Sequence, residues 1–141
     1  MNSLTEDFLD ACETQMNIDT NCLLVEEQDG LVMISMGYTL KDKSYPLTVS
    51  LLFYDDCDTF DVYVQRDFPT DDKKQNYSMF FRMNKINKKY RDITCYMDKN
   101  ILGIKYLTNV DNNLDNVCNI TSKFIPLADN LIAEIIGEYN E

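Results

Sequence analysis

Few side chains in this 141-residue chain are of the types that carry out catalysis, and those present form no recognisable motif. Histidine is absent, so the side chain that most often serves as a general base near neutral pH is missing. The glycines form neither a phosphate-cradling loop nor a nucleophile elbow, and they occur only at Gly30, Gly37, Gly103 and Gly137. We therefore expect a protein that is not an enzyme.

The remaining candidates for acid–base catalysis are two pairs of adjacent aspartates, Asp55-Asp56 and Asp71-Asp72. Both pairs lie between predicted elements, where aspartates commonly begin turns and helices. The first pair opens an acidic stretch that resembles the start of a calcium-binding loop. Such a loop needs glycine at its sixth position and glutamate at its twelfth, but counting from Asp56 these are Asp61 and Asp67. A solvated hairpin turn is expected there.

The five cysteines are odd in number and far apart in sequence, which favours free thiols over disulfides. Four of them lie on apolar faces of predicted elements, so we expect those side chains to be buried. A zinc site is not expected, because the chain has neither a CxxC pair nor a histidine. No metal and no cofactor are predicted. The cysteines are Cys12, Cys22, Cys57, Cys95 and Cys118.

The chain is strongly acidic, with 24 acidic residues against 13 basic ones and a net charge of −11. This balance argues against binding to nucleic acid or to an anionic membrane, because both attract basic proteins. The charges are also segregated. Residues 1–29 hold eight acids and no base, whereas Lys73 to Arg91 hold seven bases and no acid. Two interpretations stay open: solvated helix faces of opposite sign that lie near each other, or an electrostatic contact within the fold or across a dimer.

Length and composition predict one domain over residues 1–141, large enough for a core of its own. No apolar run is long enough to cross a bilayer. The segment Met1 to Asp7 has no basic residue of the kind that opens a secretory signal. The expected location is therefore the cytoplasm.

Six short runs that alternate apolar and polar residues predict β-strands. The first two are joined by Asp29-Gly30, a strong hairpin signal, and the last two by the turn Asp98 to Asn100. The predicted strands cover residues 21–26, 31–36, 47–54, 60–65, 93–97 and 101–107.

Apolar residues at steps of three and four predict three helices, over residues 4–16, about 73–90 and about 111–139. The third has the broadest apolar stripe, which the other elements must cover. Asn112, with Asp115, is expected to cap it, and Pro126 to cause a kink or short break at residues 121–125. The second helix is expected to bury Tyr77, Phe80, Phe81, Met83 and Ile86.

The element order is therefore α-β-β-β-β-α-β-β-α. Short hairpins require antiparallel pairing, and the amphipathic helices must cover one face of the sheet. The predicted fold class is α+β, with an antiparallel sheet of five to six strands and three helices.

The opposite sheet face is a candidate contact surface. If the helices cover the side of Val49, Leu51 and Phe53, then the other side bears Leu52, Tyr54, Tyr63 and Tyr96. Aromatic residues on an open sheet form a plausible platform for a partner or for a second copy of the chain. An ordinary outer face, or one covered by a loop or helix, is the alternative.

The segment Phe80 to Asn87 contains an apolar-Asn-x-apolar-Asn pattern, at Met83-Asn84-Lys85-Ile86-Asn87, that resembles the YbjN-like bacterial family. The strand pair that follows and the closing helix with Phe124 fit the same family, so the resemblance covers about residues 60–139. It implies a fold like that of the type III secretion chaperones, which are small, acidic, cytosolic dimers that hold an extended segment of a client protein. It implies no catalytic residues. Asn84 and Asn87 themselves either brace the following loop or take part in recognition.

The functional hypothesis is a non-enzymatic, homodimeric protein-binding module of YbjN-like type, with a chaperone-like or regulatory role. Its partner is another protein, with no nucleic acid and no membrane involved. One alternative is a structural or assembly subunit whose sheet face is a permanent interface. Another is an acidic decoy that occupies a nucleic-acid-binding protein, which the acid-rich first helix supports. Decoy binding would weaken steeply with ionic strength, whereas an aromatic sheet contact would not.

Overall fold

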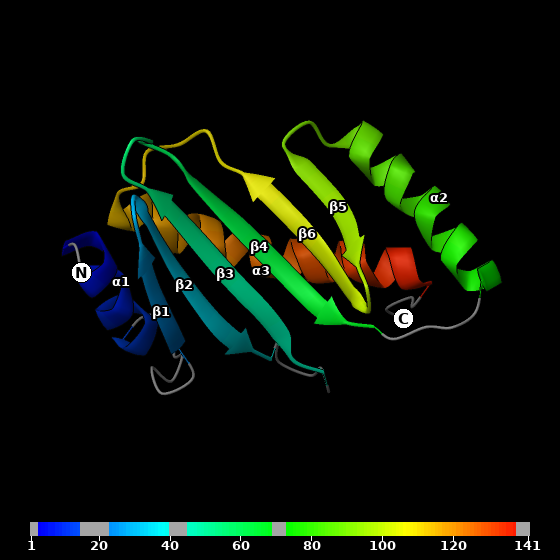
Figure 1. The fold of residues 1–141 in the computed structure, drawn as a ribbon, viewed down its shortest axis with the longest axis horizontal. Helices are drawn as coiled ribbons and strands as arrows, with labels where there is room; N and C mark the ends of the chain where they lie inside the picture. Colours follow the sequence, from blue (N-terminus) through cyan, green and yellow to red (C-terminus); the bar gives the residue numbers. More distant parts are fainter. Residues whose placement is uncertain (1–2, 15–22, 40–44, 69–72, 138–141) are drawn as a thin grey trace.

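The computed structural model describes residues 3–14, 23–39, 45–68 and 73–137, and it has the predicted α+β fold (Figure 1). The helices and strands follow one another in the predicted order, with boundaries within a few residues of those expected. They are α1 (Ser3–Thr14), β1 (Leu23–Gln28), β2 (Leu31–Tyr38), β3 (Leu47–Tyr54), β4 (Phe60–Asp67), α2 (Lys73–Lys89), β5 (Ile93–Asp98), β6 (Ile101–Leu107) and α3 (Leu114–Ile136).

All six strands form one antiparallel sheet in the order β1-β2-β3-β4-β6-β5. Two-residue turns close its outer hairpins: Asp29-Gly30 joins β1 to β2, and Lys99-Asn100 joins β5 to β6. Gly30 and Lys99 have positive φ angles of 75° and 56°, and such angles are easiest for glycine. The strand β6 folds back from β5 and pairs with β4 on its other side, so β5 is left at the edge of the sheet.

The core lies between one face of the sheet and α3, which runs behind the strands in Figure 1. The sheet contributes alternate residues of β2, β3, β4, β5 and β6, and α3 contributes the apolar stripe seen in the sequence. Fully burying one such aliphatic or aromatic side chain stabilises the fold by about 1.5–3 kcal/mol. The buried residues of the stripe include Val117, Phe124, Ile125, Ala128, Leu131, Ile132 and Ile135.

The expected break at residues 121–125 is wrong, because α3 continues unbroken through Pro126. Pro126 is exposed, and so is Ser122, whose carbonyl loses its helical donor to the proline. That carbonyl lies on the solvent side, where water can satisfy it, so the helix tolerates the proline. The expected cap is one residue off as well, since the side chain of Asn113 accepts a hydrogen bond from the Asn116 amide at 2.9 Å.

The expectation that α2 buries its aromatic residues is also wrong. The buried side of α2 is Met79, Met83 and Ile86, at steps of four and three, whereas Tyr77 and Phe81 are 78% and 69% exposed. The reason is the position of the helix. It lies at the β5 edge of the sheet and packs on β5 and α3, so only one narrow stripe is covered (Figure 1).

The acidic and basic segments lie at opposite ends of the molecule. The acid-rich α1 lies near β1, and the basic α2 packs on β5, and these two strands are the two edges of the sheet (Figure 1). Five strand spacings of about 4.8 Å separate the edges by roughly 24 Å. Among the described residues the two segments are therefore too far apart for an electrostatic contact within one chain, and the interpretation that these helices lie near each other is wrong.

The described cysteines are free thiols, but not all are buried. Cys12 and Cys95 lie in the core, Cys118 is half-buried, and Cys57 is exposed in the turn between β3 and β4. Cys22 lies outside the described residues.

Asn87 braces the edge strand β5. Its Oδ1 atom accepts a hydrogen bond from the amide of Cys95 at 2.6 Å, and its Nδ2 atom donates to the carbonyl of Cys95 at 3.4 Å. Asn84, one turn earlier, is exposed. Of the two roles considered for these asparagines, Asn87 has the bracing one, directed at the strand instead of at the loop before it.

The substitution Asn87→Ala should lower the free energy of unfolding by about 1–3 kcal/mol, because it leaves the Cys95 amide without its acceptor. Asn84→Ala is the matched control, since it makes the same change at an exposed position of the same helix. Urea unfolding of both variants measures the difference. Equal effects of the two substitutions would contradict the bracing role.

The Cys95 thiol should make stability fall at alkaline pH. Burial, and then the nearby negative charge of Glu134, raise the pKa of this thiol from 9.0 to about 12 in the folded protein. Between pH 9 and pH 12 the unfolded chain therefore binds fewer protons than the folded one, and the free energy of unfolding decreases as pH rises. Chemical denaturation across this range should show a shallower decrease for Cys95→Ala than for the wild type. Parallel curves would contradict the assignment.

Candidate functional site on the open face of the sheet

The four predicted contact residues all lie on the sheet face that points away from α3. Strand alternation puts Leu52 and Tyr54 opposite in direction to the buried Leu51 and Phe53 of the same strand β3. In the part of the chain that the structure describes, the helices contact the other face, as Figure 1 shows. We call this surface the open face.

Two of the four residues are in direct contact. The rings of Tyr63 on β4 and Tyr96 on β5 meet edge to face, with centroids 6.3 Å apart. The hydroxyl of Tyr96 accepts a hydrogen bond from Nε2 of Gln65 at 2.6 Å, which holds its ring over β6 and against β4. Such aromatic pairs are worth about 0.5–1.5 kcal/mol beyond the area that they bury.

Leu52 and Tyr54 extend the same face along β3. Leu52 stands opposite Asp61 on β4 and Met33 on β2, and each of these side chains is half-buried. Burial raises the pKa of the Tyr54 phenol, and the negative charge of Asp61 raises it further. Tyr63 also raises the pKa of Tyr54, so Tyr54 is electrostatically coupled to the Tyr63–Tyr96 pair.

Gly103 makes room for the Tyr96 ring. The two residues are cross-strand partners, and a Cβ atom at position 103 would lie 2.2 Å from Cζ of Tyr96. Only glycine therefore allows the tyrosine ring to lie flat across β6 in this position. The sequence shows a glycine inside a strand, which is a signal for close approach, but the partner follows only from the register.

A lysine and an aspartate lie next to Tyr63 on this face. Lys105 pairs with Tyr63, and its Nζ atom is 5.5 Å from the centre of the tyrosine ring, within cation–π range. A hydrogen bond with Tyr63 raises the pKa of Lys105, so the ammonium stays charged at neutral pH. Burial raises the pKa of Asp61, while Lys105 opposes that shift. The face thus places apolar rings beside a lysine and an aspartate, and strand alternation puts further carboxylates on the same side at Glu26, Asp67 and Asp98.

The sequence predicts that Asp61 and Gln65 point to the same side as Tyr63, but it names neither them nor Gly103 and Lys105 as contact residues of this surface. Their positions in the alternating pattern place each on the open side of its strand, and this could have been read from the sequence. Their contacts could not, because they depend on β6 lying between β4 and β5.

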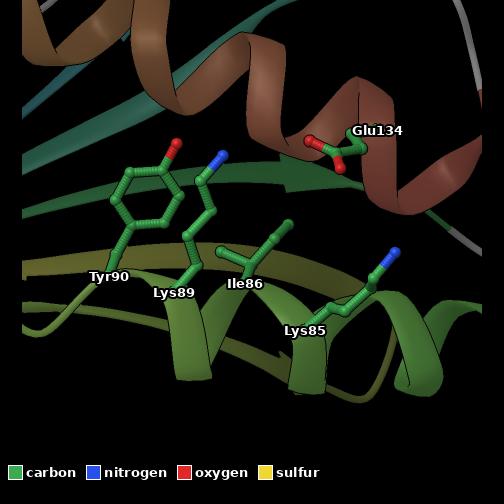
Figure 2. Close-up of a pocket in the computed structure, with 5 residues that line it drawn as sticks. All are labelled: Lys85, Ile86, Lys89, Tyr90 and Glu134. Atoms are coloured by element: carbon green, nitrogen blue, oxygen red, sulfur yellow. The ribbon is translucent and has the colours of Figure 1, made fainter.

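A hollow lies on the helix side of the molecule, between α2 and α3 (Figure 2). It has a volume of about 250 Å³ and is lined by Lys85, Ile86, Lys89, Tyr90 and Glu134. The Nζ atom of Lys89 lies 5.3 Å from the centre of the Tyr90 ring. The hollow is slightly smaller than the range usual for small-molecule sites, about 300–1,000 Å³.

The described residues offer neither a metal-binding cluster nor a membrane-spanning helix. Within the ranges given above, no three side chains of histidine, cysteine, aspartate or glutamate come together as a metal site would require. None of the described helices has the length and apolar character that crossing a membrane demands.

Comparison with known proteins gives no match: no protein-family model, no curated protein and no solved structure is significantly similar to this chain.

The contact between Gly103 and Tyr96 predicts that the effect of Gly103→Ala on the free energy of unfolding depends on the residue at position 96. Gly103→Ala should lower the free energy of unfolding by about 1–3 kcal/mol, because the new methyl group displaces the ring. In a Tyr96→Ala background the same substitution should be neutral or stabilising, since alanine costs less backbone entropy than glycine. Urea unfolding of the four proteins of this cycle tests the pairing. Equal losses in both backgrounds would contradict it.

Proposed function

We propose that this protein is a non-enzymatic, homodimeric protein-binding module whose contact surface is the open face. The observation that carries the proposal is the half-buried Tyr63–Tyr96 pair, joined by Leu52 and Tyr54, on a sheet face that no described helix contacts. Tyrosine and methionine are enriched at protein interfaces, where a rigid ring supplies area and its hydroxyl supplies a polar contact.

The charges of the open face suit a two-fold dimer. In such a dimer the same patch serves both copies, so a residue i that contacts j is matched by j contacting i. Asp61 precedes Tyr63 by two residues on β4, and Lys105 is the partner of Tyr63 on β6, so the carboxylate of one copy could approach the ammonium of the other. Apolar rings at the centre and one complementary pair of charges beside them would favour a single orientation.

Chaperone-like or regulatory binding of a client in the bacterial cytoplasm is the finer form of the proposal. It is supported by the resemblance of the segment Met83 to Asn87 to the YbjN-like family, and by the element order, which agrees with a type III secretion chaperone-like fold. A permanent assembly interface on the same face is the second candidate. Dilution distinguishes a regulatory dimer from a permanent assembly interface. A regulatory dimer dissociates within the range of protein concentrations that can be measured, and an obligate dimer does not.

Light scattering of the wild type and of Tyr63→Asp tests the proposal. We expect the wild type at twice the 16.5 kDa mass of one chain and the variant at the single mass, because an aspartate at the centre of an apolar contact is costly to desolvate. Ser122→Asp is the control, since it adds the same charge at an exposed site on α3, behind the sheet. It should remain a dimer.

Two results would count against this function. If the wild type is a monomer at all concentrations, the homodimer is wrong. If Tyr63→Asp remains a dimer, the open face is not the interface. Circular dichroism of each variant shows that a change of mass does not come from unfolding.

A further inference from the structure

The outer side of α2 exposes more aromatic surface than any other element that the structure describes. Tyr77 is 78% exposed, Phe81 is 69% exposed and Phe80 is 48% exposed. Tyr77 and Phe81 are four residues apart, so their rings are neighbours on one side of the helix. Scattered apolar side chains are normal at a surface, but adjacent exposed aromatic rings mark interaction sites.

Exposed lysines continue the same side of the helix. Lys85 and Lys88 follow Phe81 by four and seven residues, which places them in line with it along α2. We call Tyr77, Phe81, Lys85 and Lys88 the outer stripe. It lies opposite the buried side formed by Met79, Met83 and Ile86, so packing within the chain does not explain the aromatic pair.

We propose that the outer stripe is a docking site for an acidic amphipathic helix of a partner protein. Apolar side chains of the partner pack on Tyr77 and Phe81, and its carboxylates approach Lys85 and Lys88. Exposed Lys88 and Lys89 also stand in the last turn of α2, where their charge already complements the helix dipole. An apolar anchor next to like-signed charges is a common way in which a helix selects a partner helix.

Charge excludes the obvious alternative occupants. Pairing of α2 with α2 of a second copy is opposed by charge repulsion, because each chain has seven bases and no acid between Lys73 and Arg91. A long polyanion, such as nucleic acid or an anionic bilayer, extends beyond this segment and is repelled by the 24 acidic residues, which all lie outside it. A short acidic segment avoids both penalties, because it contacts the basic stripe without approaching the rest of the surface.

The hollow between α2 and α3 lies next to the outer stripe and can receive a side chain of the partner. Lys85 belongs both to the outer stripe and to the lining of the hollow, as Figure 2 shows, so a segment that runs along α2 passes its mouth. Ile86 and the Tyr90 ring supply apolar walls, and Glu134 on α3 disfavours a carboxylate inside. The hollow therefore suits an apolar side chain of the partner, while its acids stay on the lysines outside.

This site is separate from the open face. The outer stripe belongs to a helix that packs on the edge strand β5 and on α3, whereas Tyr63 lies on the sheet side away from α3. A dimer formed through the open face leaves α2 accessible in both copies. The two proposals therefore fail or succeed independently.

Fluorescence anisotropy with a synthetic probe tests the docking site. The probe is a fluorescein-labelled helical peptide as long as α2, with leucines along one side and glutamates on both flanks. We expect it to bind the wild-type protein, and Phe81→Ser to weaken binding by about tenfold, the loss typical of one anchor side chain. Leu24→Ser is the matched control, because Leu24 is 55% exposed on β1 at the far edge of the sheet.

The charged half of the stripe has its own pair of variants. Lys88→Glu should weaken probe binding by about tenfold at low salt and reduce its salt dependence, whereas Lys123→Glu, the same change at an exposed site on α3, should do neither. Tyr63→Asp should bind the probe as the wild type does. All five variants change exposed or half-buried side chains, and thermal unfolding verifies that each is folded.

Any one of five results would overturn the proposal. The wild type fails to bind the probe, or a peptide of the same composition with its leucines shuffled binds equally well. Phe81→Ser binds the probe as tightly as Leu24→Ser does. Phe81→Ser abolishes self-association of the wild type, which would make a second copy the occupant. Duplex DNA or phosphatidylserine vesicles bind the wild type more tightly than the probe and lose binding with Lys88→Glu.

Discussion

Burial of the apolar stripe of α3 against the sheet is the constraint on which the rest of the fold depends. A helix of this apolar character is not stable alone in water, so the strands must present a matching face to it. Val49, Val62 and Ile104, from three neighbouring strands, are all fully buried on that face. Once the helix covers one side of the sheet, every second residue of each strand is assigned to the other side.

The open face and the outer stripe of α2 both result from this single-sided burial. The sheet has one helical layer, so its second face keeps a surface of half-buried rings around Tyr63 and Tyr96. The helix α2 lies at the β5 edge and buries only the side that meets β5 and α3. Both surfaces therefore exist because the described helices bury their apolar sides on the same side of the sheet.

The two surfaces differ in the distribution of charge. On the open face two charges of opposite sign, Asp61 and Lys105, lie next to Tyr63, which suits a self-complementary contact. The outer stripe is wholly basic at Lys85 and Lys88 in an otherwise acidic molecule, which suits an acidic partner of another kind. A protein with both surfaces could bind a second copy and a client at the same time.

The sequence by itself determined the element order, the antiparallel pairing, the apolar stripe of α3 and the side of the sheet on which Leu52, Tyr54, Tyr63 and Tyr96 lie, because periodicity and short turns are local properties. Only the tertiary structure decided that β6 lies between β4 and β5, which sets Tyr96 on Gly103. It also decided which side of α2 is buried. The apolar residues of α2 run around most of the helix, so the stripe that packs depends on its neighbours at the sheet edge.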